Sequence, residues 1–311
     1  MHVEKRKVGK RTKYYLAHTL RIQKKFKKLR VYLGLSENEA NKKRPEAERI
    51  LKERIAAYKT ISDPFRNVIT PSELGEIKTL VAKGEVKIRH LSEDDWRIFT
   101  ESFVYNTNAI EGSSVTPGEV KDILEKEQWP KEREKWEISE TYGLSDAVSY
   151  IRKTKEHISL QLIKDLHRIV FKNSKSFAGA FRKRGQEVAV VNSLGEVMHR
   201  GAPSATVVKL LKDLVAWYDK SRNKYPAIVL AIVVHNQFET IHPFADGNGR
   251  VGRLLLNNIL LMHNKPPVNI ELRNRKEYYA ALREYQNTGN IRPTIELILR
   301  EYRSFRKMLK R

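Results

Sequence analysis

The stretch HPFADGNGRVGR, residues 242–253, lies between two apolar segments with helical spacing, AIVVHNQFET before it and RVGRLLLNNILLM after it. Its proline and glycines predict a loop that runs directly into the N-terminus of a helix. The first backbone N–H groups of a helix have no partner within it and carry a positive partial charge, so they attract anions. Gly247 and Gly249 let the backbone turn further N–H groups inward as a nest for phosphate oxygens. The stretch therefore predicts two helices joined by an anion-binding loop.

Two arginines strengthen this interpretation. Arg250 and Arg253 fall three residues apart in the first turn of the second helix, so they share one face. Cations in a first turn are disfavoured by the helix dipole, by roughly 0.3–1 kcal/mol each. An anion bound between the two side chains would reverse that cost. The alternative is that both arginines are solvated surface residues.

Two further side chains of the stretch carry chemistry. Asp246 is a hard oxygen ligand beside the expected phosphates, which suits Mg²⁺ shared between one carboxylate, waters and a nucleotide. His242, held by Pro243, can accept a proton at neutral pH from a hydroxyl that attacks phosphorus. The alternatives are an ordinary turn aspartate and a structural histidine. The sequence holds no GxxxxGK[ST] phosphate loop and no HExxH zinc motif.

Length and composition predict a globular protein of one large or two small domains, with 311 residues of which 40% are hydrophobic. The longest apolar run has eight residues, from Ala227 to Val234, far below the roughly 20 that span a bilayer. The N-terminus is charged but lacks the apolar centre of a secretory signal. The chain contains no cysteine, so disulfides and thiolate metal sites are excluded. We expect a cytoplasmic protein.

The positive charge is concentrated near the N-terminus. Residues 1–60 hold 19 Lys and Arg against 6 Asp and Glu, a net +13, so the other 251 residues carry only +10 of the total of +23. Such a segment is typical of proteins that bind nucleic acid or another acidic partner. The alternative is a solvated basic surface.

The N-terminal segment predicts its own small unit. Aromatic and branched residues at 14–22 and 29–33 flank the basic QKKFKK, which indicates a β-hairpin, and apolar spacing over 45–58 indicates a helix. Two prolines within 60–73 predict a boundary. We therefore expect three parts: a basic hairpin and helix at 1–60, a linker and helical region at 61–135, and the main domain at 136–311.

The rest of the chain reads as mainly α. Ser92 with Asp95, and Thr116 with Pro117 and Glu119, predict capped helix starts. The one exception is 188–199, where two extended arms predict a projecting β-hairpin. Further helices are expected at about 139–154, 159–172, 204–221, 226–240, 250–263, 274–287 and 293–308.

The stretch at 242–253 resembles the HPFx[DE]GNGRxxR signature of Fic proteins, which transfer AMP from ATP to hydroxyl side chains of target proteins. The resemblance covers roughly residues 90–305. GAFRKR from Gly179 is similar to the family's GxFR segment, 188–199 to its target-holding flap, and KEYYAALREYQNTGNIRPTIELIL to its C-terminal helices. The implied fold is a Fic-type helical domain with a β-hairpin flap.

The resemblance assigns roles residue by residue. It implies that His242 is the base, that Asp246 is the ligand of Mg²⁺ or Mn²⁺, and that the flap both touches the nucleotide and aligns the target. ATP is the implied substrate, and the family often has asparagine where this chain has Gln286. The implied nucleotide-binding residues are Gly247, Asn248, Gly249, Arg250, Arg253, Tyr278, Tyr279, Gln286, Val197, Met198, His199 and Arg200.

A second motif lies upstream. The segment TNAIEG, from Thr107 to Gly112, ends a predicted helix with Glu111 followed by glycine, which is also a normal helix stop. It resembles the family's inhibitory [ST]xxxE[GN] motif in the class that carries it N-terminal to the core. The resemblance implies that Glu111 pairs with Arg253 and occupies the donors needed by the ATP γ-phosphate.

These patterns together predict an autoinhibited protein adenylyltransferase that acts on a Ser, Thr or Tyr hydroxyl of a target protein. Glu111 would also position water for removal of AMP from the modified target. Two alternatives stay open. One is a nucleic-acid-binding regulator whose helical domain senses nucleotide, and the other is a Fic enzyme that transfers a different phosphate-containing group.

Overall fold

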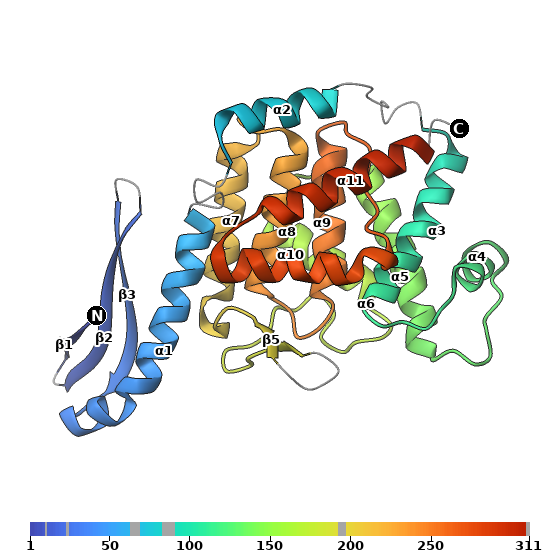
Figure 1. The fold of residues 1–311 in the computed structure, drawn as a ribbon. Helices are drawn as coiled ribbons and strands as arrows, with labels where there is room; N and C mark the ends of the chain where they lie inside the picture. The colour runs from blue at the N-terminus through green and yellow to red at the C-terminus, as the bar shows by residue number, and fades with distance from the viewer. Residues whose placement is uncertain (10, 23–24, 63–68, 83–90, 192–196, 309–311) are drawn as a thin grey trace.

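The computed structural model describes residues 1–9, 11–22, 25–62, 69–82, 91–191 and 197–308. Figure 1 shows a helical body with a three-stranded sheet at one end, and α1 between the sheet and that body. The strands are β1 (His2–Val8), β2 (Arg11–Ile22), β3 (Lys25–Gly34), β4 (Ala189–Val191) and β5 (Val197–Arg200). The helices are α1 (Glu37–Ser62), α2 (Pro71–Ala82), α3 (Glu93–Ile110), α4 (Pro117–Lys126), α5 (Lys135–Lys153), α6 (Leu160–Phe171), α7 (Val207–Ser221), α8 (Ala227–Ile241), α9 (Asn248–Met262), α10 (Arg275–Thr288) and α11 (Arg292–Met308).

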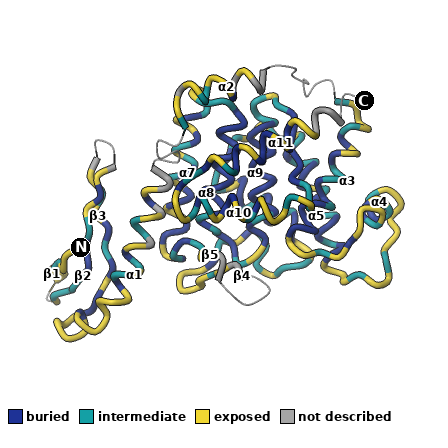
Figure 2. Tube along the Cα trace, in the orientation of Figure 1, coloured by how far each residue is buried: buried dark blue, intermediate teal, exposed yellow. Residues whose placement is uncertain are grey.

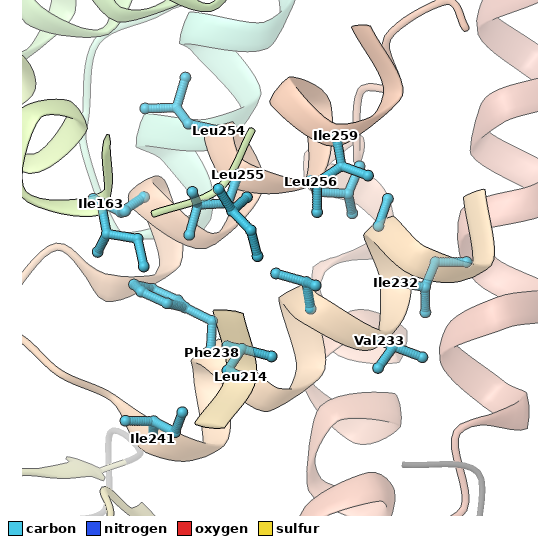
Figure 3. Packing of buried hydrophobic residues seen from close by; sticks show 14 of the residues in the cluster. Ile163, Leu214, Ile232, Val233, Phe238, Ile241, Leu254, Leu255, Leu256 and Ile259 are labelled. Carbon is cyan, nitrogen blue, oxygen red and sulfur yellow. The ribbon is translucent and has the colours of Figure 1, made fainter. Parts of the chain in front are cut away.

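The centre of the body is the pair α8 and α9. Both helices are buried along most of their length, as Figure 2 shows. Helices that are buried on nearly every side need neighbours on every side, and the other helices of the body supply them. Figure 3 shows the resulting core, to which α6, α7, α8 and α9 contribute Ile163, Leu214, Ile232, Val233, Phe238, Ile241, Leu254, Leu255, Leu256 and Ile259.

The helix starts that the sequence predicts at Ser92 and Thr116 are confirmed. Each residue is the N-cap of its helix, and its side chain accepts the backbone N–H of the acid three residues later. In each case that acid, Asp95 or Glu119, accepts the backbone N–H of the cap in return. These reciprocal bonds satisfy donors that a bare helix end leaves unpaired, and they fix where α3 and α4 begin.

The N-terminal unit is larger than the predicted hairpin and helix. The expected strands form β2 and β3, but β1 adds a third strand that pairs antiparallel with β2. Its sequence, HVEKRKV, is mostly charged, and its side chains are mostly exposed, so no apolar alternation marks it. The expected helix at 45–58 also starts earlier, at Glu37, and includes Pro45.

The other predicted elements are present within a few residues of their expected bounds. The hairpin expected at 188–199 appears as β4 and β5, which pair antiparallel, while its expected turn at 192–195 lies outside the described residues. Helix α2 was not expected, because its sequence falls at the predicted boundary. The division at residues 60 and 135 stays a prediction. Within the described ranges, no helix is long and apolar enough to cross a membrane.

Leu255→Ala should lower the free energy of unfolding by about 2–5 kcal/mol, because it leaves a cavity at a fully buried position. Val208→Ala is the matched control, since Val208 lies on α7 with 47% of its surface exposed, and it should change stability by less than about 0.5 kcal/mol. Chemical denaturation of both variants measures the difference. Equal effects would contradict the described core.

Candidate active site

The motif loop joins the two central helices through a left-handed turn. His242 is the C-cap of α8 with φ of 51°, and Gly247 is the N-cap of α9 with φ of 80°. A Cβ on Gly247 would lie 2.3 Å from ring atoms of Phe171, so only glycine fits here. Between these ends, the Asn248 side chain accepts the Phe244 N–H at 2.8 Å and donates to the Phe244 carbonyl at 3.0 Å. The Asn248 side chain thus braces the loop.

Arg182, in the GAFR segment, holds the loop from outside. Its guanidinium is buried and donates to the backbone carbonyls of His242 at 2.8 Å, Ile241 at 3.2 Å and Ala202. The backbone N–H of Arg182 donates to the Pro243 carbonyl at 2.9 Å. Five donors in one planar group suit this role. Arg182 therefore fixes both the motif loop and the chain leaving β5.

His242 is set up to accept a proton. Its Nδ1 lies 3.2 Å from the Glu239 carbonyl, which can only accept, so Nδ1 carries the hydrogen and Nε2 is the accepting atom. The side chain is 15% exposed. Burial lowers the pKa of His242 to about 4, although the Glu239 carbonyl and Glu111 act in the opposite direction. The imidazole is therefore neutral at pH 7.

His167 of α6 fixes the backbone of the expected metal ligand. Its Nδ1 accepts the Gly179 N–H at 2.8 Å, so its Nε2 donates to the Asp246 carbonyl at 3.1 Å. The ring stacks on Phe244, with centroids 3.8 Å apart. Sequence reasoning missed this histidine, because nothing in its spacing links it to residue 246.

The Asp246 carboxylate faces solvent and two cations. Its side chain is 49% exposed, and Lys175 Nζ lies 3.0 Å from Oδ2. Partial burial would raise the pKa of Asp246, but Arg250 and Lys175 outweigh it and hold the pKa below its usual value. A single exposed, ionised carboxylate fits Mg²⁺, which keeps several waters and takes its other ligands from phosphates. Within the described residues, no group of three or more acidic or histidine side chains could hold a metal.

Arg250 is buried, contrary to the solvated alternative. It forms an ion pair with Glu140 of α5, and its guanidinium lies over the Phe171 ring, 4.5 Å from the centroid. Lys175 Nζ is 3.7 Å from the same Glu140 carboxylate. The Glu140 carboxylate therefore supplies the negative charge that a buried Arg250 requires. Sequence reasoning identified Arg250 but missed Glu140 and Lys175.

Arg253 is held by four hydrogen bonds. It is 2% exposed, and its Nη2 donates to Glu111 Oε1 at 2.8 Å and to the Thr107 carbonyl at 3.0 Å. Its Nε donates to Thr107 Oγ1 at 3.2 Å, and its Nη1 to Tyr278 OH at 3.3 Å. The structure thus brings the upstream TNAIEG segment onto the second arginine of the loop.

Glu111 lies over the start of α9. Burial would raise the pKa of Glu111, but Arg253 and Arg250 outweigh that effect and leave it lowered, so the carboxylate is ionised. A Cβ built on Gly249 would lie 2.1 Å from Glu111 Oε1. The carboxylate therefore occupies space directly at the first turn of α9. Gly112, with φ of 98°, turns the chain away after it.

The remaining expected site residues lie at different depths. Tyr278 is 1% exposed, and its hydroxyl contacts His235 Nε2 at 2.9 Å as well as Arg253. Tyr279 is half-buried and donates to the Ile110 carbonyl at 3.1 Å. Gln286 is half-buried on α10, and Arg200 is exposed on β5. The side chains of Val197, Met198 and His199 lie outside what the structure describes. Tyr278 thus contacts Arg253 directly, and Tyr279 holds the backbone just before Glu111.

Comparison with known proteins agrees with this geometry. The model of the Fic/DOC family matches residues 157–260. Protein adenylyltransferase fic-1 of Caenorhabditis elegans is 34% identical over 204 residues, 63% of this chain and 38% of that protein. Protein adenylyltransferase Fic of Nematostella vectensis is 33% identical over 205 residues, 63% of this chain and 45% of that protein. The chain thus spans less than half the length of these relatives.

The fold agrees as well. A solved fragment of Fic-1 from Caenorhabditis elegans superposes with a TM-score of 0.64 at 26% identity, covering 88% of this chain and 85% of that one. The family match spans the motif loop at 242–253 and His167, and the sequence match extends well beyond it. Residues 157–260 therefore form a domain of the Fic/DOC family, which makes this chain a Fic-domain protein.

Proposed function

We propose that this chain is an autoinhibited protein adenylyltransferase that transfers AMP from ATP to a Ser, Thr or Tyr hydroxyl of a target protein. The observation that carries the proposal is the convergence of four groups at the start of α9. A neutral His242, the Asp246 carboxylate and two buried arginines surround one helix N-terminus. The names of the relatives, protein adenylyltransferases, support the same reaction.

In the proposed reaction the target hydroxyl oxygen attacks the α-phosphorus of ATP. The bond between that phosphorus and the bridging oxygen to the β-phosphate breaks, and pyrophosphate leaves. His242 Nε2 takes the hydroxyl proton, because Nδ1 already carries a hydrogen that it donates to the Glu239 carbonyl. Arg250, Arg253 and the N–H groups of the first turn of α9 hold the phosphates.

Asp246 would hold Mg²⁺, which supplies charge neutralisation at the phosphates. The chain's own part is to keep that carboxylate ionised and in place. Lys175 at 3.0 Å and the bond from His167 to the Asp246 carbonyl do so. We propose that the target segment binds along the edge of β5, beside the loop that Arg182 fixes. A cytoplasmic location stays a prediction.

The autoinhibition follows from competition for one cation. Arg253 pairs with Glu111 Oε1 at 2.8 Å, and the same oxygen lies 2.1 Å from where a Cβ on Gly249 would be. A γ-phosphate that sought the same guanidinium would meet a fixed negative charge within a few ångströms. At 4 Å, like charges repel by about 4 kcal/mol at an effective dielectric constant of 20. Removal of AMP from a modified target, which would use the same Glu111, stays a prediction.

His242→Ala should reduce AMP transfer at least about 100-fold, because general bases contribute 10² to 10⁴ to rates. ATP affinity should stay nearly unchanged, since the imidazole acts on the target hydroxyl and not on the nucleotide. Self-modification with labelled ATP and calorimetric ATP titration measure the two quantities. Transfer at the parent rate would contradict the assigned base.

The rate of transfer should stay level from pH 7 down to about pH 5. The neutral imidazole is the active form, and burial places its pKa at about 4, so protonation begins well below the ordinary histidine value of about 6.5. The measurement is the rate of self-modification at saturating ATP and magnesium in the Glu111→Gly variant. A fall centred near pH 6.5 would show that His242 behaves as a solvated histidine.

Glu111→Gly should raise the rate of self-modification at least about tenfold, since Arg253 then pairs with the γ-phosphate. Glu127→Gly is the matched control. It also removes a carboxylate at a helix end, at the left-handed C-cap of α4, and it should leave the rate unchanged.

Arg253→Ala completes this test, because it should be inactive with Glu111 present or absent. The Glu111→Gly protein should lose stability without nucleotide, because Arg253, which is 2% exposed, is left without its carboxylate partner. ATP with magnesium should restore that stability. If the Glu111→Gly variant is no more active than the parent, TNAIEG is only a helix end and not an inhibitory segment.

A further inference from the structure

The sheet at the N-terminus has two unlike faces. One face packs on α1, where Leu16, Leu20, Leu29 and Leu33 are buried with Leu51. The other, which we call the outer face, is defined by pairing across the strands. Tyr15 of β2 lies opposite Glu4 of β1 and opposite Tyr32 of β3, so all three project on the side away from α1.

The outer face is rich in positive charge. Alternation along each strand places six cations and one acid on it. The acid is Glu4, and Arg30, Lys28 and Arg6 lie 2.9, 3.1 and 3.9 Å from it. The six cations are Arg6, Arg11, Lys13, Arg21, Lys28 and Arg30. One carboxylate cannot balance six cations, so the face as a whole attracts an extended anion.

Aromatic and hydroxyl groups lie among these cations. The rings of Tyr15 and Tyr32 touch edge to face, with centroids 5.5 Å apart. Tyr32 is 46% exposed, and Phe26, near the start of β3, is 73% exposed. Thr19 is exposed on β2 between them. Large exposed aromatics within a basic surface are typical of binding sites.

We propose that the outer face binds duplex DNA, with the sheet lying in the major groove. Strands pair about 4.8 Å apart, so three strands span about 10 Å between their outer axes. The major groove of B-form DNA is about 12 Å wide, which is more than this span. The edge strands β1 and β3 then bring Arg6, Lys28 and Arg30 towards the phosphates. On the central strand β2, Lys13 and Arg21 lie towards its two ends, from where their long side chains reach the flanking phosphates.

The same geometry disfavours duplex RNA, whose major groove is deep and narrow. The site is also separate from the AMP-transfer chemistry. In Figure 1 the sheet and the region of β5 lie apart, and the sheet meets the helical body through α1 and through the ion pair of Lys27 with Asp213 of α7. DNA binding therefore does not depend on the proposed function, and the two can fail independently.

The test uses the full chain and a 20-base-pair duplex of random sequence, with fluorescence anisotropy from 50 to 200 mM salt. If all six cations neutralise phosphates, the logarithm of affinity falls with a slope of about −5 against the logarithm of salt, about a thousandfold over that range. Lys13→Ala with Arg21→Ala should weaken binding roughly tenfold or more and reduce the slope by about two.

Lys42→Ala with Lys43→Ala is the matched control, because it removes the same charge from exposed positions on α1. It should leave affinity and slope nearly unchanged. Circular dichroism should show all variants folded, and self-modification should stay at the parent rate.

Three outcomes would overturn the proposal: no duplex binding at 50 mM salt, equal losses in the two double variants, or stronger competition by single-stranded DNA, duplex RNA or poly-glutamate than by duplex DNA. The first outcome would mean that the outer face is a solvated surface. The second would mean that binding is non-specific attraction to the charge of the chain. The third would mean that the face binds another class of partner.

Discussion

A guanidinium buried in a helical core determines how this molecule is arranged. Arg253 stays charged at any pH a protein meets, and it is 2% exposed on α9. A buried charge is tolerated only with an opposite charge and satisfied donors. Glu111 and Thr107 at the end of α3 supply both, from 142 and 146 residues away in the sequence. The electrostatic need of one side chain therefore ties α3 to α9.

Local patterns made most of the fold predictable. Apolar spacing marked the helices around the core, and the pairs at Ser92 and Thr116 marked two helix starts, because a reciprocal cap is written in four consecutive residues. The same signal was present at Thr70 and Glu73, whose side chains form such contacts at the start of α2. It was missed there because prolines nearby also favour a boundary. The strand β1 could not be read, since an exposed edge strand needs no apolar alternation.

The candidate site was only half visible in the sequence. A motif lists residues that lie together along the chain, so His242, Asp246 and the arginines could be named. Partners that lie far away in the sequence leave no local signal. His167 contacts the Asp246 carbonyl from 79 residues away, and Glu140 pairs with Arg250 from 110 residues away. The sequence placed Asn248 in the loop, but it did not reveal the hydrogen bonds by which the Asn248 side chain holds the backbone of Phe244. Sequence identifies the chemistry here, and packing decides which groups perform it.

Gly249 has a consequence for how such a chain can change over generations. Any side chain there would begin 2.1 Å from Glu111 Oε1, so positions 111 and 249 cannot both carry groups that point into the same space. A side chain at 249 would have to displace the Glu111 carboxylate from Arg253, whereas after loss of Glu111 it would meet only the Arg253 guanidinium, 3.1 Å away. The order of mutations is therefore constrained in one direction. A lineage that keeps the contact between Glu111 and Arg253 in this geometry is therefore expected to keep the glycine as well.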